Sequence, residues 1–257
     1  MQAGVRRATA ADVERCTDIL ARAFRDDPGA AIFEPEPNRR RLIMPRFFRM
    51  FLLAGLAEGG EIVVPEGEVA GVASWFGPER HGPSDAAMEA AGMADVVAAF
   101  GPSAAARMTA MAGEIEDQHA RRMPEPHLRL DFFGVDPDRQ ASGIGSLLMA
   151  HGHAIADREH LPCYLETFTE ANVRYYERRG YAATGTYRVG DGVPVYAMVR
   201  PPSSASAAWA LAEREAPAAR AGHQAGQMTT WGTLGRHLPN DDAFRPLASA
   251  APPRIRA

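Results

Sequence analysis

Two glycines at a strand-to-helix junction constrain this chain more than any other feature of its sequence. The stretch GVDPDRQASGIGSLLM, Gly134–Met149, begins as the end of an apolar strand and continues as an amphipathic helix. Before it, HLRLDFFGV alternates two sets of side chains, with Leu128, Leu130 and Phe132 on one face, which predicts a β-strand. A second apolar strand, LPCYLETF, follows the helix. A strand–helix–strand unit of this kind predicts two parallel strands joined by a right-handed crossover.

Apolar residues recur at helical or strand spacing along most of the first 200 residues. Together these runs favour an α/β domain at residues 1–200, with a central sheet and helices on both faces. The expected elements are a short strand at 4–8, helices over 11–25 and 39–58 (the second disturbed at Pro45), a hairpin over 61–77, one or two helices over 83–122, a short helix over 170–179 and a final hairpin around Gly190–Gly192.

The composition changes beyond Arg200, where alanine, proline, glycine and serine dominate. Such a segment carries too few large apolar side chains to build a core of its own. Residues 201–257 are therefore expected to form a low-complexity tail, mostly disordered or lying on the surface of the domain.

Charge and composition exclude several classes of function. The formal net charge of −4 argues against nucleic acid or an anionic membrane as the main partner. The only cysteines, Cys16 and Cys163, cannot form a disulfide framework or a paired-cysteine zinc site, and His151 and His153 do not share a helix face, so we expect no metal. The N-terminus lacks a signal-peptide core and the longest apolar stretch is too short to cross a bilayer, which predicts a cytoplasmic protein.

The glycine turn is either a tight turn or a cradle for a phosphate. The N-terminus of a helix presents unpaired N–H groups, and glycine lets the backbone approach an anion closely. The turn carries no G-K-[ST] segment, so it is not the loop of a nucleoside-triphosphatase. Leu148 stands where a dinucleotide-binding fingerprint needs its third glycine, so that motif is also incomplete. The two glycines alone do not decide between turn and cradle.

A family resemblance favours the cradle. The segment resembles the acetyl-coenzyme-A loop of the GCN5-related N-acetyltransferases (GNAT), whose pattern Q/R-x-x-G-x-G/A is filled by Gln140, Gly143 and Gly145. Ala141 departs from the glycine that is frequent after the glutamine. The later segment LETFTEANVRYYERRGY resembles the second half of the family pattern. The resemblance is close from residue 128 to residue 200. AFRDDP and the helical insert before the cofactor strand are similar to the puromycin-acetyltransferase-like branch.

The resemblance implies a mixed sheet of six or seven strands that is splayed between the cofactor strand and the next one, and acetyl-CoA as the co-substrate. Tyr176, four residues after Asn172 and on the same helix face, is the expected general acid, since an ordinary phenol is protonated at pH 7. Glu166 is the expected general base, and Asp131, taken to share a strand face with Phe133, is its rival. The residues expected to bind the cofactor are Phe133, Val135, Arg139, Gln140, Ala141, Ser142, Gly143, Ile144, Gly145, Ser146 and Asn172.

The function implied is transfer of an acetyl group from acetyl-CoA to a primary amine of a small molecule by direct attack, in a monomer or a homodimer. Two alternatives are an acyl-CoA sensor without turnover and an acetyltransferase for protein N-termini or lysines. Asp26, Asp27, Trp75 and Phe76 are candidates for an acceptor pocket, the alternatives being charges at a helix end and core aromatic residues.

Overall fold

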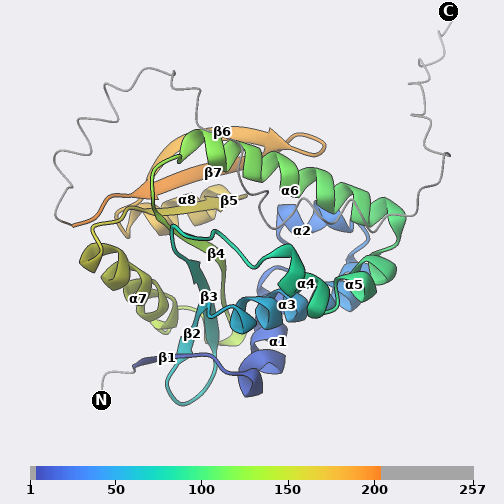
Figure 1. Ribbon diagram of the computed structural model, residues 1–257, viewed down its shortest axis with the longest axis horizontal. Helices are drawn as coiled ribbons and strands as arrows, with labels where there is room; N and C mark the ends of the chain where they lie inside the picture. The colour runs from blue at the N-terminus through green and yellow to red at the C-terminus, as the bar shows by residue number, and fades with distance from the viewer. Residues whose placement is uncertain (1–3, 204–257) are drawn as a thin grey trace, which may run out of the picture.

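The computed structural model describes residues 4–203, so the tail expected over 201–257 lies outside the described residues from residue 204 onward. Seven strands and eight α-helices form in this range (Figure 1). Their bounds are β1 Val5–Arg7, α1 Val13–Ala23, α2 Pro28–Phe33, α3 Pro37–Ala57, β2 Glu61–Pro65, β3 Gly71–Phe76, α4 Asp85–Ala90, α5 Met93–Phe100, α6 Pro102–Arg122, β4 Leu128–Val135, α7 Ile144–Arg158, β5 Cys163–Thr167, α8 Glu170–Glu177, β6 Ala182–Val189 and β7 Val193–Arg200, with short 3₁₀ turns at Ala10–Asp12 and Pro137–Arg139.

The seven strands form one mixed sheet in the order β1-β2-β3-β4-β5-β7-β6. Every neighbouring pair is antiparallel except β4 and β5, which are parallel. The α/β class, the mixed sheet and the parallel pair across the crossover are thereby confirmed. No helix among residues 4–203 is long and apolar enough to cross a membrane.

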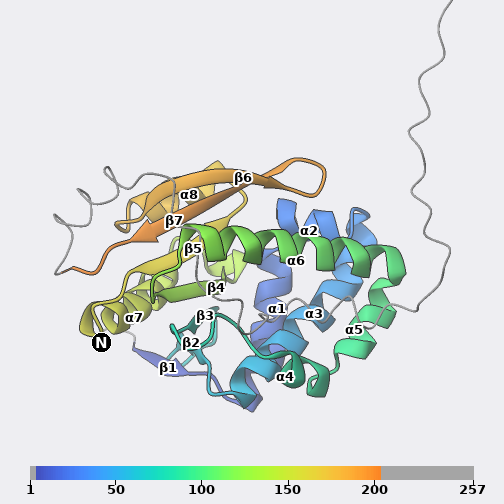
Figure 2. The same cartoon turned by 45° about the horizontal axis from the view of Figure 1, so that its top comes forward.

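Helices cover both faces of the sheet. On one face, α1, α3 and the helices of the insert pack over a core of aromatic and methionine side chains that includes Phe47, Phe48 and Phe51. On the other face, α7 and α8 enclose a smaller core built around Trp75, Leu148 and Tyr176. Figures 1 and 2 show α7 and α8 at one end of the molecule and α1–α5 gathered at the other, with α6 running from this group to β6.

The helical insert and the first helices differ from the expectation in detail. Residues 83–122 form three helices rather than one or two. A helix that was not expected, α2, begins after Asp27, whose carboxylate accepts from the Gly29 and Ala30 amides while Pro28 occupies the first turn. The long helix α3 continues through Pro45.

The strand β4 contains a β-bulge that the alternation in the sequence does not reveal. Its register with β3 pairs Phe132 with Ser74 and Leu130 with Trp75, which leaves Asp131 without a partner on β3. A bulge re-aims the side chains beyond it. Phe133 therefore joins Leu130 on the α7 side, while Phe132 packs in the opposite core. The expectation that Asp131 shares a face with Phe133 is wrong for this reason.

The parallel pair is short. Only Leu128 and Arg129 of β4 pair with β5, opposite Cys163 and Tyr164, and the rest of the two strands separates. This is the expected splay, and it leaves one edge of β4 open beyond Arg129. Amide groups at this edge have no strand partner among the described residues.

Candidate active site

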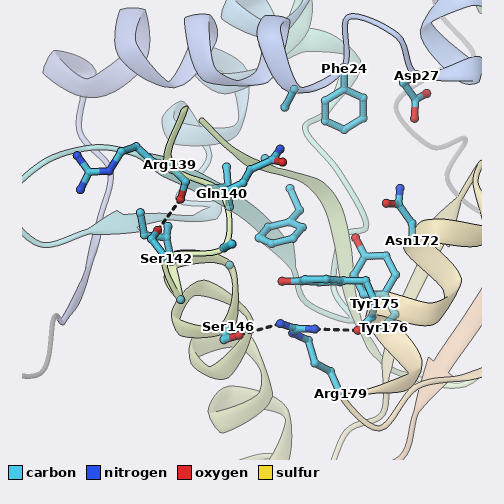
Figure 3. Close-up of a pocket in the computed structure, with 18 residues that line it drawn as sticks. Phe24, Asp27, Arg139, Gln140, Ser142, Ser146, Asn172, Tyr175, Tyr176 and Arg179 are labelled. Carbon is cyan, nitrogen blue, oxygen red and sulfur yellow. Dashed lines mark hydrogen bonds between the residues drawn. The ribbon is translucent and has the colours of Figure 1, made fainter. Parts of the chain in front are cut away.

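A cavity of about 620 Å³ lies where the splayed end of β4 meets the glycine turn, the start of α7 and α8 (Figure 3). All eleven residues expected to bind the cofactor line it, and so does Tyr176. It also contains residues that sequence reasoning missed as cofactor contacts, namely Ala23, Phe24, Gly134, Tyr175 and Arg179, together with Asp27. The fold thus brings the loop and the α8 segment together at one cavity.

The loop before α7 lines this cavity. Ala141 and Gly143 both adopt left-handed backbone conformations, with φ of 58° and 87°. The first helical bond of α7 runs from the Leu147 amide to the Gly143 carbonyl, at 3.0 Å. The preceding amides of the first turn have no intrahelical acceptor, as at every helix N-terminus, and they carry the positive end of the helix dipole. This arrangement suits an anion such as a pyrophosphate.

Gly145 provides a close approach that a larger residue would fill. A Cβ built there would lie 2.6 Å from the Tyr175 hydroxyl and 3.2 Å from the Phe133 ring. The Tyr175 hydroxyl is buried and has no hydrogen-bond partner among the described residues. Gly145 and the Tyr175 hydroxyl, which has no partner among the described residues, therefore lie at the same point of the cavity wall.

The open edge of β4 offers backbone groups to the same cavity. The Asp136 amide donates to the Ala70 carbonyl at 2.9 Å, and bonded and non-bonded pairs alternate along antiparallel strands. Gly134 is therefore the next residue that bonds to β3, while Phe133 and Val135 turn their N–H and C=O groups toward the splay. An extended ligand can pair with these groups as an added strand would.

The helix α8 places Asn172 and Tyr176 on the opposite wall. Thr169 caps this helix by accepting from the Asn172 amide, and the Asn172 side chain donates to the Thr167 hydroxyl at 3.0 Å. The Tyr176 hydroxyl points toward Asn172 (Figure 3). Burial, with Tyr175 beside it, raises the pKa of Tyr176 above its ordinary value, so its hydroxyl stays protonated at neutral pH.

Two arginines on the cavity wall differ in how they are held. The Arg139 guanidinium donates to Glu68 at 2.6 Å and is directed away from the two tyrosines (Figure 3). The Arg179 guanidinium lies 3.5 Å from the centre of the Tyr175 ring and donates to the Ser146 hydroxyl at 2.7 Å. Arg179, four residues after Tyr175, thus presents a positive charge beside the start of α7.

A second cavity, of about 90 Å³, shares Phe24 and Asp27 with the first. Its wall is mostly apolar, but it also holds three carboxylates, of Asp27, Asp131 and Glu166, and one guanidinium, of Arg129. The apolar residues that line it are Phe24, Ala30, Phe33, Met44, Phe47, Phe48, Met111, Ala112, Ile115, Leu130, Phe132 and Phe168.

Glu166 lies in the second cavity and is held by three donors. The Tyr164 and Tyr187 hydroxyls donate to one of its oxygens at 2.8 and 2.7 Å, and Arg129 donates to the other at 3.1 Å. Arg129 in turn donates to Glu116 at 2.5 Å. Burial raises the pKa of Glu166, against the attraction of Arg129. A carboxylate held this way has little freedom to take a proton from a ligand.

Asp131, on the bulge, differs from Glu166 in how its carboxylate is held. No hydrogen bond reaches its carboxylate within residues 4–203, although it lines the same cavity. Burial raises the pKa of Asp131 to about 7, against the attraction of Arg129 and with the repulsion of Glu116 and Glu166. A carboxyl group with this pKa changes its protonation state near neutral pH, as a general base requires.

Two of the acceptor-pocket candidates belong elsewhere. Trp75 and Phe76 are buried in the two cores and line neither cavity, so the interpretation as core aromatics is confirmed. Asp26 lies in an exposed turn. Asp27 caps α2 and lines both cavities, because that cap holds it between α1 and β4.

Comparison with known proteins identifies the class to which this fold and site belong. Residues 32–181, more than half of the chain, match the model of the acetyltransferase (GNAT) family. A Corynebacterium glutamicum structure described as histone acetyltransferase HPA2 and related acetyltransferase is 28% identical, with 79% of this chain and 98% of that chain covered and a TM-score of 0.59. Polyamine N-acetyltransferase of Drosophila melanogaster is 19% identical over 78% of this chain and 100% of that chain, with a TM-score of 0.46.

The chain belongs to the GNAT family of acetyltransferases. It is accordingly an acyltransferase of the N-acetyltransferase type, and the family uses acetyl-CoA as its co-substrate.

Proposed function

We propose that this protein transfers an acetyl group from acetyl-CoA to the primary amine of a small, largely apolar molecule, by direct attack and in the manner of the puromycin-acetyltransferase-like branch. The observation that carries the proposal is the second cavity, which joins an aromatic wall to three carboxylates and shares Phe24 and Asp27 with the cofactor cavity. An excess of negative charge attracts a protonated amine, and the aromatic wall receives its apolar part.

The first cavity fits the cofactor. Its volume is in the range of small-molecule sites, its loop offers unpaired amides beside a positive helix end, and its open strand edge suits an extended arm. In the proposal the loop from Arg139 to Ser146 and Arg179 hold the pyrophosphate, while the Phe133 and Val135 backbone and Asn172 hold the arm. Acetyl-CoA, when bound, supplies the thioester acetyl group that the neutral amine attacks.

Asp131 is proposed to accept the amine proton. It lines the second cavity with the aromatic wall, burial raises its pKa to about 7, and no hydrogen-bond donor among the described residues reaches its carboxylate. Glu166, the base expected from the family resemblance, has its oxygens occupied by Tyr164, Tyr187 and Arg129. We therefore propose Glu166 as a positioning residue that holds Arg129 beside Asp131.

Tyr176 is proposed to donate its hydroxyl proton to the departing sulfur. Its hydroxyl faces the cofactor cavity next to Asn172, and its raised pKa keeps it protonated at the pH at which Asp131 is ionised. An acid and a base whose pKa values are pushed apart by their surroundings can act in the same turnover.

The size of the second cavity favours a small molecule as the acceptor. A volume of about 90 Å³ admits an amine terminus with a short apolar group, which fits a small acceptor. The insert helix α6 completes the wall of this cavity with Met111, Ala112 and Ile115. In the proposal the acceptor therefore contacts the insert, which is a part of the chain similar to the puromycin-acetyltransferase-like branch.

The test is a screen of primary amines with detection of the released thiol. Aminonucleosides, arylalkylamines, polyamines, amino acids and N-terminal peptides are each offered with acetyl-CoA. The protein's own thiols do not disturb the readout, because Cys16 and Cys163 are buried and burial raises their pKa values to about 12 and 11. We expect turnover with an apolar small amine and little with peptides. Preferred acetylation of peptides would overturn the proposed acceptor class.

Tyr176→Phe separates an enzyme from a sensor. We expect this variant to bind acetyl-CoA nearly as well as the wild type, measured by calorimetry, while its kcat falls roughly 10²-fold or more because general acid catalysis is lost. Binding of acetyl-CoA without turnover of any amine by the wild type would favour the sensor. Unchanged kcat in the variant would remove Tyr176 from the acid role.

A further inference from the structure

Three histidines that are far apart in the sequence meet beside β4. His81 lies in the loop after β3, His119 in the last turn of α6 and His127 immediately before β4. Each offers a ring nitrogen, and these three nitrogens lie within 4.8 Å of one another. His119 and His127 are 3% and 0% exposed, and the Nε2 atom of His81 is buried without a hydrogen-bond partner in the described part of the chain.

The hydrogen bonds of His127 determine which of its nitrogens is bare. Its Nδ1 lies 2.7 Å from the Glu125 carbonyl oxygen, which can only accept, so Nδ1 carries the proton. In the neutral ring Nε2 then has a free lone pair. This lone pair points at the Nε2 of His119, 2.7 Å away.

The surroundings of His119 conflict with the donor role that this contact demands. If neutral His119 donates from Nε2, its bare Nδ1 faces the Glu116 carboxylate at 3.6 Å. If Nδ1 carries the proton instead, it points correctly at Glu116, but two bare Nε2 atoms then face each other at 2.7 Å. A cation that both rings bind through their Nε2 lone pairs removes this conflict.

The arrangement with the His119 proton on Nδ1, facing Glu116, is the one that metal-binding histidines use. With Nδ1–H of His127 on a backbone carbonyl and Nδ1–H of His119 toward a carboxylate, both Nε2 lone pairs are free, and the two atoms would move apart from 2.7 Å to bind a metal ion together. The Arg129 charge nearby is paired with Glu116 and Glu166.

We propose that His81, His119 and His127 form a binding site for one divalent transition-metal ion, of the class that prefers three imidazole ligands, with Zn²⁺ as the principal candidate. Imidazole suits zinc, and three protein ligands leave a fourth position for water. The expectation of no metal rested on cysteines and on His151 and His153, whereas this site joins three residues that no short spacing connects.

The ion would connect the helical insert, residues 83–122, to the sheet. It would link the loop after β3 and the end of α6 to the start of β4, two residues before Arg129. Arg129 connects Glu116, which faces His119, to Glu166 in the second cavity. The site therefore lies outside both cavities and acts on structure, through the elements that carry the acceptor wall.

The test uses the full-length protein, stripped of metal with a chelator and titrated with Co²⁺ or Zn²⁺ alone. We expect one Co²⁺ per chain, with visible absorption bands of a four-coordinate site, and a rise in Tm when Zn²⁺ is added. His81→Ala, in a loop and the least buried of the three, should bind Co²⁺ at least tenfold more weakly and lose the bands. His151→Ala, outside the cluster and half-exposed on α7, is the matched control and should retain both.

Two results would overturn the site. One is that the stripped wild type binds Co²⁺ no more tightly than His81→Ala. The other is that Zn²⁺ leaves the Tm of the wild type unchanged, a measurement that needs no variant to fold. Because both readouts use the metal alone, they are independent of whether any amine is acetylated.

Discussion

The two cavities that share Phe24 and Asp27 are built in opposite ways. The first is lined by glycines, small polar residues, aromatic rings and two arginines, and nearly all of its lining comes from two continuous segments, 133–146 and 172–179. The second is lined by large apolar side chains and buried charges from α1, α2, α3, α6, β4 and β5. A ligand that is the same throughout a family can be held by local backbone geometry, whereas the acceptor wall requires side chains assembled from the whole fold.

Because the two cavities are built from different parts of the chain, we predict that a substitution in one cavity leaves ligand binding in the other unchanged. The largest effect is expected for Asp131→Asn, in the second cavity. Loss of the general base should lower kcat/KM roughly 10²- to 10⁴-fold while the affinity for acetyl-CoA stays within about twofold. In the wild type, kcat/KM should rise with pH and level off above about 7, where Asp131 is ionised, and the variant should lose this dependence.

Rates between pH 5.5 and 9 and calorimetric titration with acetyl-CoA measure both quantities. Asp117→Asn, an exposed carboxylate on α6, is the matched control and should keep the wild-type rate and profile. If Glu166→Gln abolished the pH dependence while Asp131→Asn kept it, the base would be Glu166.

Gly145→Ala should damage the first cavity alone. The new Cβ would lie 2.6 Å from the Tyr175 hydroxyl, so the ring or the helix start must move, and such overpacking costs about 1–3 kcal/mol. We expect acetyl-CoA to bind about tenfold more weakly, with the KM for the amine unchanged. The combined change with Tyr175→Phe removes the clashing oxygen and should restore part of the affinity.

Calorimetry of acetyl-CoA binding and amine saturation curves check this prediction. Gly113→Ala on α6, where a Cβ meets nothing within 4 Å, is the matched control. An equal loss of amine and acetyl-CoA binding in Gly145→Ala would show that the two cavities do not behave separately.

The buried charge of the second cavity should also appear in stability. The folded-state pKa of Asp131, about 7, is raised above the ordinary value of 3.8, so the stability it contributes is complete below pH 3.8 and is lost as the pH rises toward 7. Asp131→Asn should therefore be more stable than the wild type at pH 8, by roughly 4 kcal/mol, with the difference shrinking toward pH 5. Urea unfolding at pH 5 and 8 measures it. A constant difference at both pH values would place the pKa of Asp131 elsewhere.

Ala141→Gly, in the loop of the first cavity, should produce the smallest change. Ala141 has a φ of 58°, a conformation that costs a non-glycine residue about 1–2 kcal/mol, while glycine loses about 0.5–1 kcal/mol of chain entropy on folding. We expect a net stabilisation below about 1 kcal/mol, measured by urea unfolding. Ala150→Gly, on the exposed face of α7, should instead destabilise the protein by about 1 kcal/mol. Destabilisation by Ala141→Gly would mean that its backbone is not strained.

The first cavity could be predicted from the sequence because its parts are local. Gly143 and Gly145 at a helix start, and Asn172 and Tyr176 one helical turn apart, are patterns of neighbouring residues, and the family resemblance gave them their meaning as a cofactor site. Arg179, in the turn after α8, follows Tyr175 by four residues, and this spacing was the available signal for their pairing.

The second cavity and the histidine cluster could not be predicted in this way. The alternation around LDFF indicates a regular strand, and only the pairing of β4 with β3 leaves Asp131 as the extra residue of a bulge. Likewise, the helix cap that holds Asp27 and the separation of 81, 119 and 127 along the chain give no periodic signal.

The sequence by itself determined the α/β class, the parallel pair at the crossover and the helix that carries Tyr176, because short-range periodicity specifies each of them, while the glycine turn was interpreted as an anion site only through the family resemblance. Only the tertiary structure decided that Asp131 and Phe133 face different cavities, that Glu166 is held by three donors, and that three histidines meet beside Arg129. These features depend on strand register and on packing between distant segments, which no local pattern encodes.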